Sequence, residues 1–224
     1  MKLGSISKFL SVFILTITSQ SYAEQQKLLP IDGKAEDHFG FSVAIDGTTA
    51  LVGAYKADAN NTRDSGAAYV YSLSSEGWKQ QAKLVAEPAY ADDTLGGNVA
   101  IKNNMAMLGA SRRDGVGKDS GAVFAFERKA NLWSQRQMLT ATDAKAGDAF
   151  GQSIALTERF LVIGAPHSDA PQKDSGAVYI YKRDKDTWQF QAKLTANDGA
   201  EGDLFGISVA IDGDTVLVGA DLND

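Results

Sequence analysis

A repeat of about 55 residues fills most of this 224-residue chain and constrains its fold more than any other feature. The tryptophans show the period directly, because Trp78, Trp133 and Trp188 are separated by 55 residues each, and an Asp-Ser-Gly triplet recurs at the same interval. The glycines that end one apolar run keep this period apart from a single step of 56; they are Gly53, Gly109, Gly164 and Gly219. A fixed period of this size indicates a solenoid, an array or a propeller.

The third repeat shows most clearly what one unit contains. Residues 150–156 and 160–165 are short runs of β-forming residues separated by three polar residues, a pattern that predicts a hairpin. After a polar loop, residues 176–181 and 188–194 predict two further strands. The first and fourth repeats carry Asp-Gly in the first turn, which favours a short hairpin. Each repeat therefore predicts one four-stranded antiparallel blade, and the chain as a whole predicts an all-β propeller.

The register of the repeat predicts how many blades are present. The repeats begin near residues 39, 95, 150 and 205, so about four blades' worth of sequence is present. Residues 25–29 match the fourth strand of a preceding blade, and the last repeat reaches Asp224 after two strands. We therefore expect part of a larger propeller of about seven blades, within the usual range of four to eight. Self-association through open blade edges, with two chains in one ring, is the alternative.

Residues 1–23 have the pattern of a secretory signal peptide. Two lysines precede the apolar run 9–17, and small residues precede an expected cleavage site between Ala23 and Glu24. The run is shorter than the roughly 20 apolar residues that span a bilayer. We therefore expect residues 24–224 to form the mature propeller, secreted or periplasmic, with no membrane span.

Charge and cysteine content restrict the possible partners. The chain has 22 basic and 28 acidic residues, and loss of the two lysines in the leader changes the net charge from −6 to −8. The sequence has no cluster of basic residues, which argues against nucleic acid and anionic membrane surfaces as partners. It also has no cysteine, so an exported product would depend on packing instead of disulfide bonds.

Phe-Gly before the first strand and Gly-Ala after the second are the most specific motifs of the repeat. Phe-Gly begins at Phe39, Phe150 and Phe205, and the second repeat has Leu95 in this position. Gly-Ala occurs in all four repeats, and the third continues with Pro166. With the Ser-Gly-Ala-Val-Tyr third strand and the tryptophan, this pattern resembles the bacterial secreted members of the FG-GAP repeat family. The resemblance extends over essentially the whole of the expected mature chain.

This resemblance to FG-GAP repeats, which also build the propellers of integrin alpha subunits, implies a seven-bladed propeller for extracellular recognition or adhesion. The resemblance also suggests calcium as a ligand, because many family members hold the ion in an Asp-x-Asp-x-Asp-Gly loop between strands one and two. Calcium takes six to eight oxygen ligands, whereas the corresponding turns here, such as 46–49 and 157–159, are short and poor in carboxylates. We expect no calcium at these hairpins, no other metal and no cofactor.

Aspartates recur at other positions of the repeat. One set lies seven and two residues before Phe-Gly, with Pro88 replacing one member; it comprises Asp32, Asp37, Asp93, Asp143, Asp148, Asp198 and Asp203. A second set follows Gly-Ala by four residues and comprises Asp58, Asp114, Asp169 and Asp224. Aspartate accepts backbone hydrogen bonds in tight turns, and every blade needs the same turns. We therefore interpret these residues as structural, with an ion-binding or ligand-binding rim as the alternative.

The sequence offers little for nucleophilic catalysis. It has no cysteine, and its two histidines, His38 and His167, fall at unlike positions of different blades. A phosphate-binding glycine loop and a zinc signature are also missing from the sequence. We predict a non-catalytic binding or adhesion module. A hydrolase or lyase acting on a polymer at the propeller mouth, and a truncated gene remnant, are the alternatives.

The loops between strands two and three are the expected binding surface. Residues 55–63, 111–118 and 166–173 differ in sequence although their flanking strands do not, as expected when a rigid scaffold presents variable loops. The candidate ligand-binding residues in these loops are Tyr55, Asp58, Arg63, Arg112, Arg113, Asp114, His167 and Asp169. We expect a protein or glycan ligand.

Overall fold

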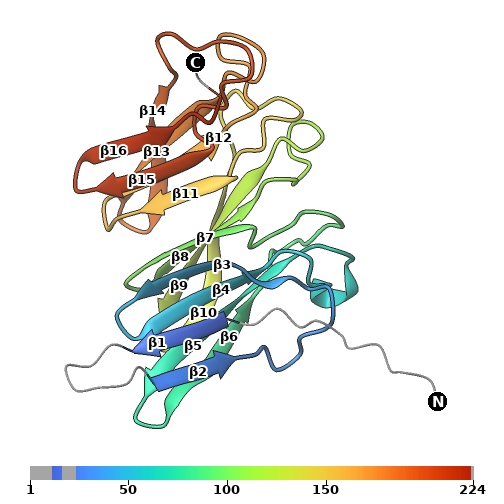
Figure 1. The fold of residues 1–224 in the computed structure, drawn as a ribbon, viewed down its shortest axis with the longest axis vertical. Coiled ribbons are helices and arrows are strands. Elements are labelled where there is room, and N and C mark those ends of the chain that lie inside the picture. The colour runs from blue at the N-terminus through green and yellow to red at the C-terminus, as the bar shows by residue number, and fades with distance from the viewer. Residues whose placement is uncertain (1–11, 17–23, 223–224) are drawn as a thin grey trace.

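The computed structural model describes residues 12–16 and 24–222. These residues form β-strands, turns and one short 3-10 helix, η1 (Ala59–Asn61). The strands make three four-stranded and two two-stranded antiparallel sheets, so the expected all-β propeller of four-stranded blades is confirmed (Figure 1). Seven blades remain a prediction. Within the described part, no helix has the length and apolar character needed to cross a membrane.

The three complete blades are meanders in which each strand pairs with the next along the chain. Blade 1 consists of β3 (Phe39–Asp46), β4 (Thr49–Ala54), β5 (Ala67–Ser74) and β6 (Gly77–Leu84). Blade 2 consists of β7 (Asn98–Lys102), β8 (Met105–Ala110), β9 (Ala122–Lys129) and β10 (Leu132–Leu139). Blade 3 consists of β11 (Ser153–Leu156), β12 (Phe160–Ala165), β13 (Ala177–Asp184) and β14 (Thr187–Leu194).

A half-blade follows blade 3 and consists of β15 (Ser208–Asp212) and β16 (Thr215–Gly219). The first blade and the half-blade lie toward opposite ends of the molecule (Figure 1). The first strands lie side by side, β3 against β7, β7 against β11 and β11 against β15. These strands are therefore the innermost ones of the propeller.

At the N-terminal end, β1 (Val12–Thr16) pairs with β2 (Glu24–Leu28). The Gln26 amide group donates to the Trp78 carbonyl oxygen at 2.9 Å and accepts from the Trp78 amide at 2.8 Å. Gln137 on β10 makes the same two bonds with Trp188 of blade 3. β2 therefore occupies the fourth-strand position of a blade preceding blade 1, as the register predicted. Apart from β1, the expected signal peptide and its cleavage site lie outside the described residues.

Two recurring glycines allow consecutive blades to approach each other closely. Within the half-blade, the amide of Gly206, in the Phe-Gly motif, donates to the carbonyl oxygen of Gly219, in the Gly-Ala motif, at 2.9 Å. A Cβ atom added to Gly164 of blade 3 would lie 2.0 Å from the Gly206 carbonyl oxygen, well inside van der Waals contact. The two motifs are therefore two sides of one backbone contact between neighbouring blades.

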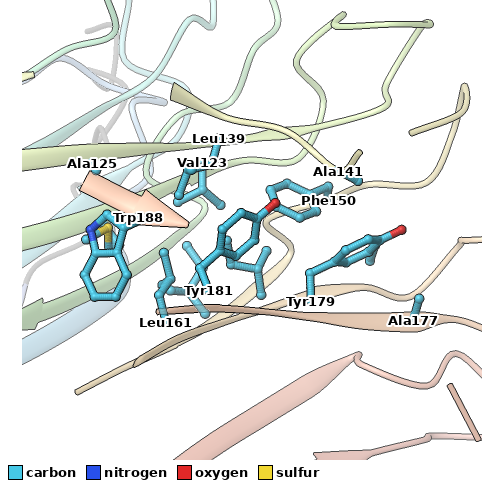
Figure 2. Close-up of a cluster of buried hydrophobic side chains, with 14 of the residues drawn as sticks. Val123, Ala125, Leu139, Ala141, Phe150, Leu161, Ala177, Tyr179, Tyr181 and Trp188 are labelled. Carbon is cyan, nitrogen blue, oxygen red and sulfur yellow. The ribbon is translucent and has the colours of Figure 1, made fainter. Parts of the chain in front are cut away.

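Apolar side chains from facing blades form the core. Between blades 2 and 3, Val123 and Leu139 of blade 2 pack with Phe150 and Tyr179 of blade 3 in one buried cluster (Figure 2). The Phe150 and Tyr179 rings meet edge to face, with centroids 5.3 Å apart. Trp188 is buried in the same cluster. Each blade therefore depends on its neighbour for burial of its apolar surface.

Candidate functional site

A hollow of about 830 Å³ lies where the first strands begin and the second strands end. Four of its lining residues occupy one position of consecutive repeats, two residues after the first residue of the Phe-Gly motif: Phe41, Gly97, Gln152 and Ile207. Equivalent positions from every repeat can meet only near the axis, so this hollow is the mouth of the propeller. We call it the axial hollow.

An aromatic group forms one side of the axial hollow. The rings of Phe41 and Tyr55 have centroids 4.5 Å apart, and those of His38 and Tyr55 are 5.0 Å apart. Phe41 is exposed and Tyr55 is half-buried. Exposed ring faces of this kind can stack on sugar rings or on aromatic side chains.

Charged side chains line the axial hollow beside these rings. Lys56 and Arg112 occupy equivalent positions in blades 1 and 2, directly after the residue that follows Gly-Ala. Asp64 and Asp92 also belong to the lining. Aromatic surface combined with a few charged groups is typical of sites that fix the orientation of a polar ligand.

The lining differs between blades although the backbone of each blade is the same. The position of Phe41 holds glycine, glutamine and isoleucine in the later repeats, and that of Tyr55 holds Ser111 in blade 2. A lining that only served blade packing would keep similar residues, as the strands do. The variation gives the axial hollow an asymmetric surface on a symmetric scaffold.

The structure brings some of the predicted binding residues to this hollow. Tyr55 and Arg112 line it directly. The guanidinium of Arg63 forms an ion pair with Asp92, which is itself a lining residue. His167 is half-buried in blade 3, where its Nδ1 atom lies 3.3 Å from Oδ1 of Asp174.

Three other predicted residues stabilise the loops. Asp58 and Asp114 each accept a hydrogen bond from the amide of the aspartate in the next Asp-Ser-Gly triplet, at 3.0 and 2.8 Å. Asp169 accepts from Asp174 in the same way at 3.1 Å. These bonds agree with the structural interpretation of the recurring aspartates.

The aspartates two residues before Phe-Gly are buried turn residues. The side chains of Asp37 and Asp148 each accept a hydrogen bond at 2.8 Å from the amide three residues earlier, and Asp93 and Asp203 repeat this pattern. Burial raises the pKa of Asp37, Asp93 and Asp148, because it disfavours the charged carboxylate. Their recurrence therefore reflects the turn that every blade needs.

The earlier aspartate of each pair has a different role, which sequence reasoning missed. Asp143 accepts a hydrogen bond from the Tyr179 hydroxyl at 2.7 Å and pairs with the Lys193 ammonium at 2.6 Å. In blade 1, Lys83 pairs with Asp32 at the same distance. Burial acts to raise the pKa of Asp143, but the hydrogen bonds and charge of its partners outweigh burial, so the pKa is lowered.

Asp143, Tyr179 and Lys193 form a triad in blade 3. In blade 2 all three members of this triad are replaced together. Pro88, Phe124 and Met138 stand where the other two blades have aspartate, tyrosine and lysine. In their place, the buried guanidinium of Arg113 forms an ion pair with Asp93. Arg113 was a predicted binding residue, but its side chain is buried, and the site proposed below does not include it. The coordinated change among three repeats is the sequence signal that could have revealed the triad.

A smaller polar hollow of about 420 Å³ lies beside η1 and is lined by Asp32, Asp37, Asp58 and Lys83 among others. Asp32 is paired with Lys83, and Asp37 and Asp58 accept backbone hydrogen bonds. Among the side chains that the structure describes, no group of three or more His, Cys, Asp or Glu residues is arranged to hold a metal ion.

A family model for the FG-GAP repeat matches four segments, residues 22–71, 78–126, 133–181 and 188–224. The chain belongs to the FG-GAP repeat family. The boundaries of the matched segments repeat the period of the tryptophans, since the second, third and fourth segments each begin at Trp78, Trp133 or Trp188. No curated protein matches the chain.

Among solved structures, this FG-GAP chain is similar to the crystal structure of Saccharomyces cerevisiae Sqt1, with 10% sequence identity and a TM-score of 0.45. The match covers 70% of this chain and 36% of the Sqt1 chain. The chain thus spans little more than a third of the length of that structure.

In blade 1, the hairpin between strands one and two, which holds calcium in many FG-GAP proteins, bonds to the neighbouring blade through Asp46. Oδ1 of Asp46 lies 3.0 Å from the Lys102 ammonium, and Oδ2 accepts from the amide of Asn103 at 2.6 Å. Both bonds cross to blade 2. They hold the Asp46 pKa below its usual value, the Asn103 amide contributing most. Asp46 therefore serves as a link between blades.

Proposed function

We propose that this FG-GAP chain is an exported, non-catalytic binding module that takes a protein or glycan ligand in the axial hollow. The observation that carries the proposal is the convergence of four equivalent but chemically different residues, from Phe41 to Ile207, on one mouth. Aromatic faces and paired charges beside them supply the stacking and polar contacts that such a ligand needs.

Arrays of glycans and peptides, probed with the purified chain, test the ligand class. Tyr55→Ala and Arg112→Ala should each weaken binding of a hit by about tenfold or more, as expected for aromatic and arginine anchors. Arg159→Ala is the matched control, because this exposed arginine lies in the turn between β11 and β12, at the opposite end of the strands. Equal weakening by Arg159→Ala would place the site elsewhere. Turnover of a hit that is lost on Asp92→Asn would contradict the non-catalytic assignment.

Export is supported by the pattern of residues 1–23. Expression in an exporting bacterium, followed by N-terminal sequencing of the product outside the cytoplasm, tests this part. We expect the product to begin at Glu24. A product that stays in the cytoplasm with residues 1–23 attached would contradict export, whatever the outcome of the binding arrays.

A further inference from the structure

A second hollow, of about 700 Å³, lies at the end of the strands opposite to the axial hollow. It is formed where the first strands end, the second strands begin and the third strands end, and all of its lining belongs to the three complete blades. We call it the basal hollow. Its polar lining consists of Asp46, Thr48, Thr49, Asn103, Asn104, Glu127, Arg128, Lys129 and Arg183.

The charged residues in and around the basal hollow carry a surplus of positive charge. The lining residues and their ion-pair partners comprise five cations and three carboxylates, namely Lys102, Arg128, Lys129, Arg136 and Arg183 against Asp46, Glu127 and Asp186. The surplus is two positive charges, in a chain whose overall net charge is −6. A concave surface with charge of one sign concentrates ions of the opposite sign. The basal hollow therefore favours an anionic ligand.

A single carboxylate holds three of these cations in place. The side chain of Glu127 is 13% exposed. Its carboxylate lies 3.1 Å from the Lys129 ammonium, 3.3 Å from Nε of Arg136 and 3.5 Å from the Arg183 guanidinium. Asp186 also pairs with Lys129, at 3.3 Å, but its side chain is exposed, and exposed ion pairs are weak. The three cations are thus held together without being neutralised.

The fourth cation, Arg128, forms no ion pair within the part of the chain that the structure describes. Its Nε atom donates to Oδ1 of Asn104 at 3.0 Å, and its Nη1 atom donates to the Thr49 hydroxyl at 3.3 Å. The guanidinium lies over the Trp133 ring, 5.4 Å from its centroid. All three partners are neutral, and none of them uses the Nη2 amino group. Arg128 is therefore fixed in position with its charge uncompensated.

The next repeat shows which partner Arg128 lacks. Arg183 occupies the position of Arg128 in blade 3 and reaches the Glu127 carboxylate of the preceding blade. The position of Glu127 is occupied in blade 1 by Ser72. Arg183 thus has a carboxylate partner in the preceding blade, and Arg128 does not. An anion bound beside Arg128 would take the place of that carboxylate.

We propose that the basal hollow binds a phosphate group, with Arg128 as its anchor. A phosphate monoester carries a charge of about −1.5 to −2 at pH 7, which matches the surplus of the basal hollow. Arginine binds phosphate oxygens through charge-assisted hydrogen bonds, and the Nη2 group of Arg128 is the unused donor. Lys129 and Arg183 supply further positive charge in the lining. The proposal does not depend on the ligand of the axial hollow.

NMR titration of the full chain with inorganic phosphate and with glucose 6-phosphate tests the site, at an ionic strength held constant with chloride. The indole N–H signal of Trp133 reports binding locally, because Arg128 lies over this ring. We expect saturable binding, and the tighter of the two ligands shows whether the group is free or carried by a sugar. Arg128→Gln should weaken binding by about tenfold or more, because it removes charge-assisted hydrogen bonds.

Arg159→Gln is the matched control. It removes the same charge from an exposed arginine at the same end of the strands, outside the lining of the basal hollow. This variant should bind phosphate as the wild type does. Equal weakening by Arg128→Gln and Arg159→Gln would overturn the proposal, since it would indicate general attraction by charge instead of a site.

Ser72→Glu tests the site without removing a cation. It gives blade 1 the carboxylate that blade 2 has at this position, so the new side chain should pair with Arg128 and compete with phosphate. We expect binding to weaken by about tenfold, and thermal melts to show that the variant stays folded.

Three further results would overturn the proposal. The first is a wild-type chain that shows no saturable shift with either phosphate ligand at millimolar concentrations. The second is phosphate binding that persists unchanged in both Arg128→Gln and Ser72→Glu. The third is binding of glucuronate or glucose 6-sulfate as tight as that of glucose 6-phosphate, which would show that the basal hollow does not select phosphate.

Discussion

The guanidinium of Arg113 pairs with the carboxylate of Asp93 inside blade 2, where both side chains are almost fully buried. Arg113 also donates to the carbonyl oxygen of Pro88 at 3.1 Å and stacks on the ring of Tyr90, 4.1 Å from its centroid. A single arginine thus satisfies a buried charge that every blade carries and fills the space left by the missing triad.

Replacing this arginine with serine, the residue of blade 3 at the same position, should destabilise the chain strongly. Arg113→Ser leaves the Asp93 carboxylate buried without its partner, which costs about 3 to 5 kcal/mol. Urea unfolding followed by tryptophan fluorescence measures the loss, and Arg112→Ala is the exposed control. The double variant Arg113→Ser/Asp93→Asn should recover part of the loss, since no charge is left unpaired. A loss below about 1 kcal/mol, as for a surface pair, would contradict the burial of this pair.

The triad of blade 3 predicts a pH-dependent contribution to stability. Because the folded-state pKa of Asp143 is lowered, its contribution is present above the unfolded-state pKa of about 3.9 and is lost as the pH falls through the folded-state value. Asp143→Asn should therefore cost about 0.5 to 1 kcal/mol at pH 7, a small value because the carboxylate is half-exposed. The cost should vanish at a pH below the folded-state pKa.

Asp198→Asn is the matched control for this measurement. Asp198 has the same place in the repeat ahead of the half-blade, and the strands described there, β15 and β16, carry no tyrosine or lysine that could serve as its partner. Its substitution should leave stability unchanged across the same pH range. A pH-independent cost of Asp143→Asn would show that packing, and not the charge of Asp143, accounts for its effect.

Sequence reasoning correctly predicted what repetition itself determines. The four strands of each blade follow from apolar runs that recur with the period. The boundaries were less accurate. β11 begins at Ser153 instead of Phe150, because Phe150 leaves the sheet to form a parallel bridge with Gly121 of the blade before. That contact joins distant parts of the chain, and no local pattern reveals it.

The candidate site was predicted only in part, because local sequence patterns reveal some of its residues and not others. Tyr55 and Arg112 could be found because loops that vary between identical strands mark a surface. Phe41 was missed, since it lies in a strand and resembles a core residue until its exposure is known. Arg113 was assigned to the surface because it lies beside Arg112, and only its contact with Asp93 shows that it is buried.

The glycine contact between blades predicts a large difference between two alanine substitutions. Gly164→Ala would place its Cβ 2.0 Å from the Gly206 carbonyl oxygen, so blade 3 and the half-blade would have to separate. We expect a loss of about 3 kcal/mol or more in unfolding free energy, at the upper end of overpacking costs. Gly213→Ala meets open space and is strained only by its backbone angle φ of +56°, which costs about 1 to 2 kcal/mol. Equal losses would contradict the close approach.

Calcium should leave the thermal stability unchanged. A ligand that binds only the folded state raises the melting temperature, but both carboxylate oxygens of Asp46 are already engaged by blade 2. Melting curves with millimolar calcium and with a chelator should therefore superimpose. A higher melting temperature in calcium that is abolished by Asp46→Asn would show that the ion displaces Lys102.

Each blade is tied to the next by the same short parallel bridge, Gly66 to Leu95, Gly121 to Phe150 and Gly176 to Phe205. If the chain were pulled from its two termini, these bridges would break one after another. Extension in an optical trap should then show stepwise unfolding, in which each step lengthens the chain by about one repeat. Steps of similar length would reflect the period of the sequence.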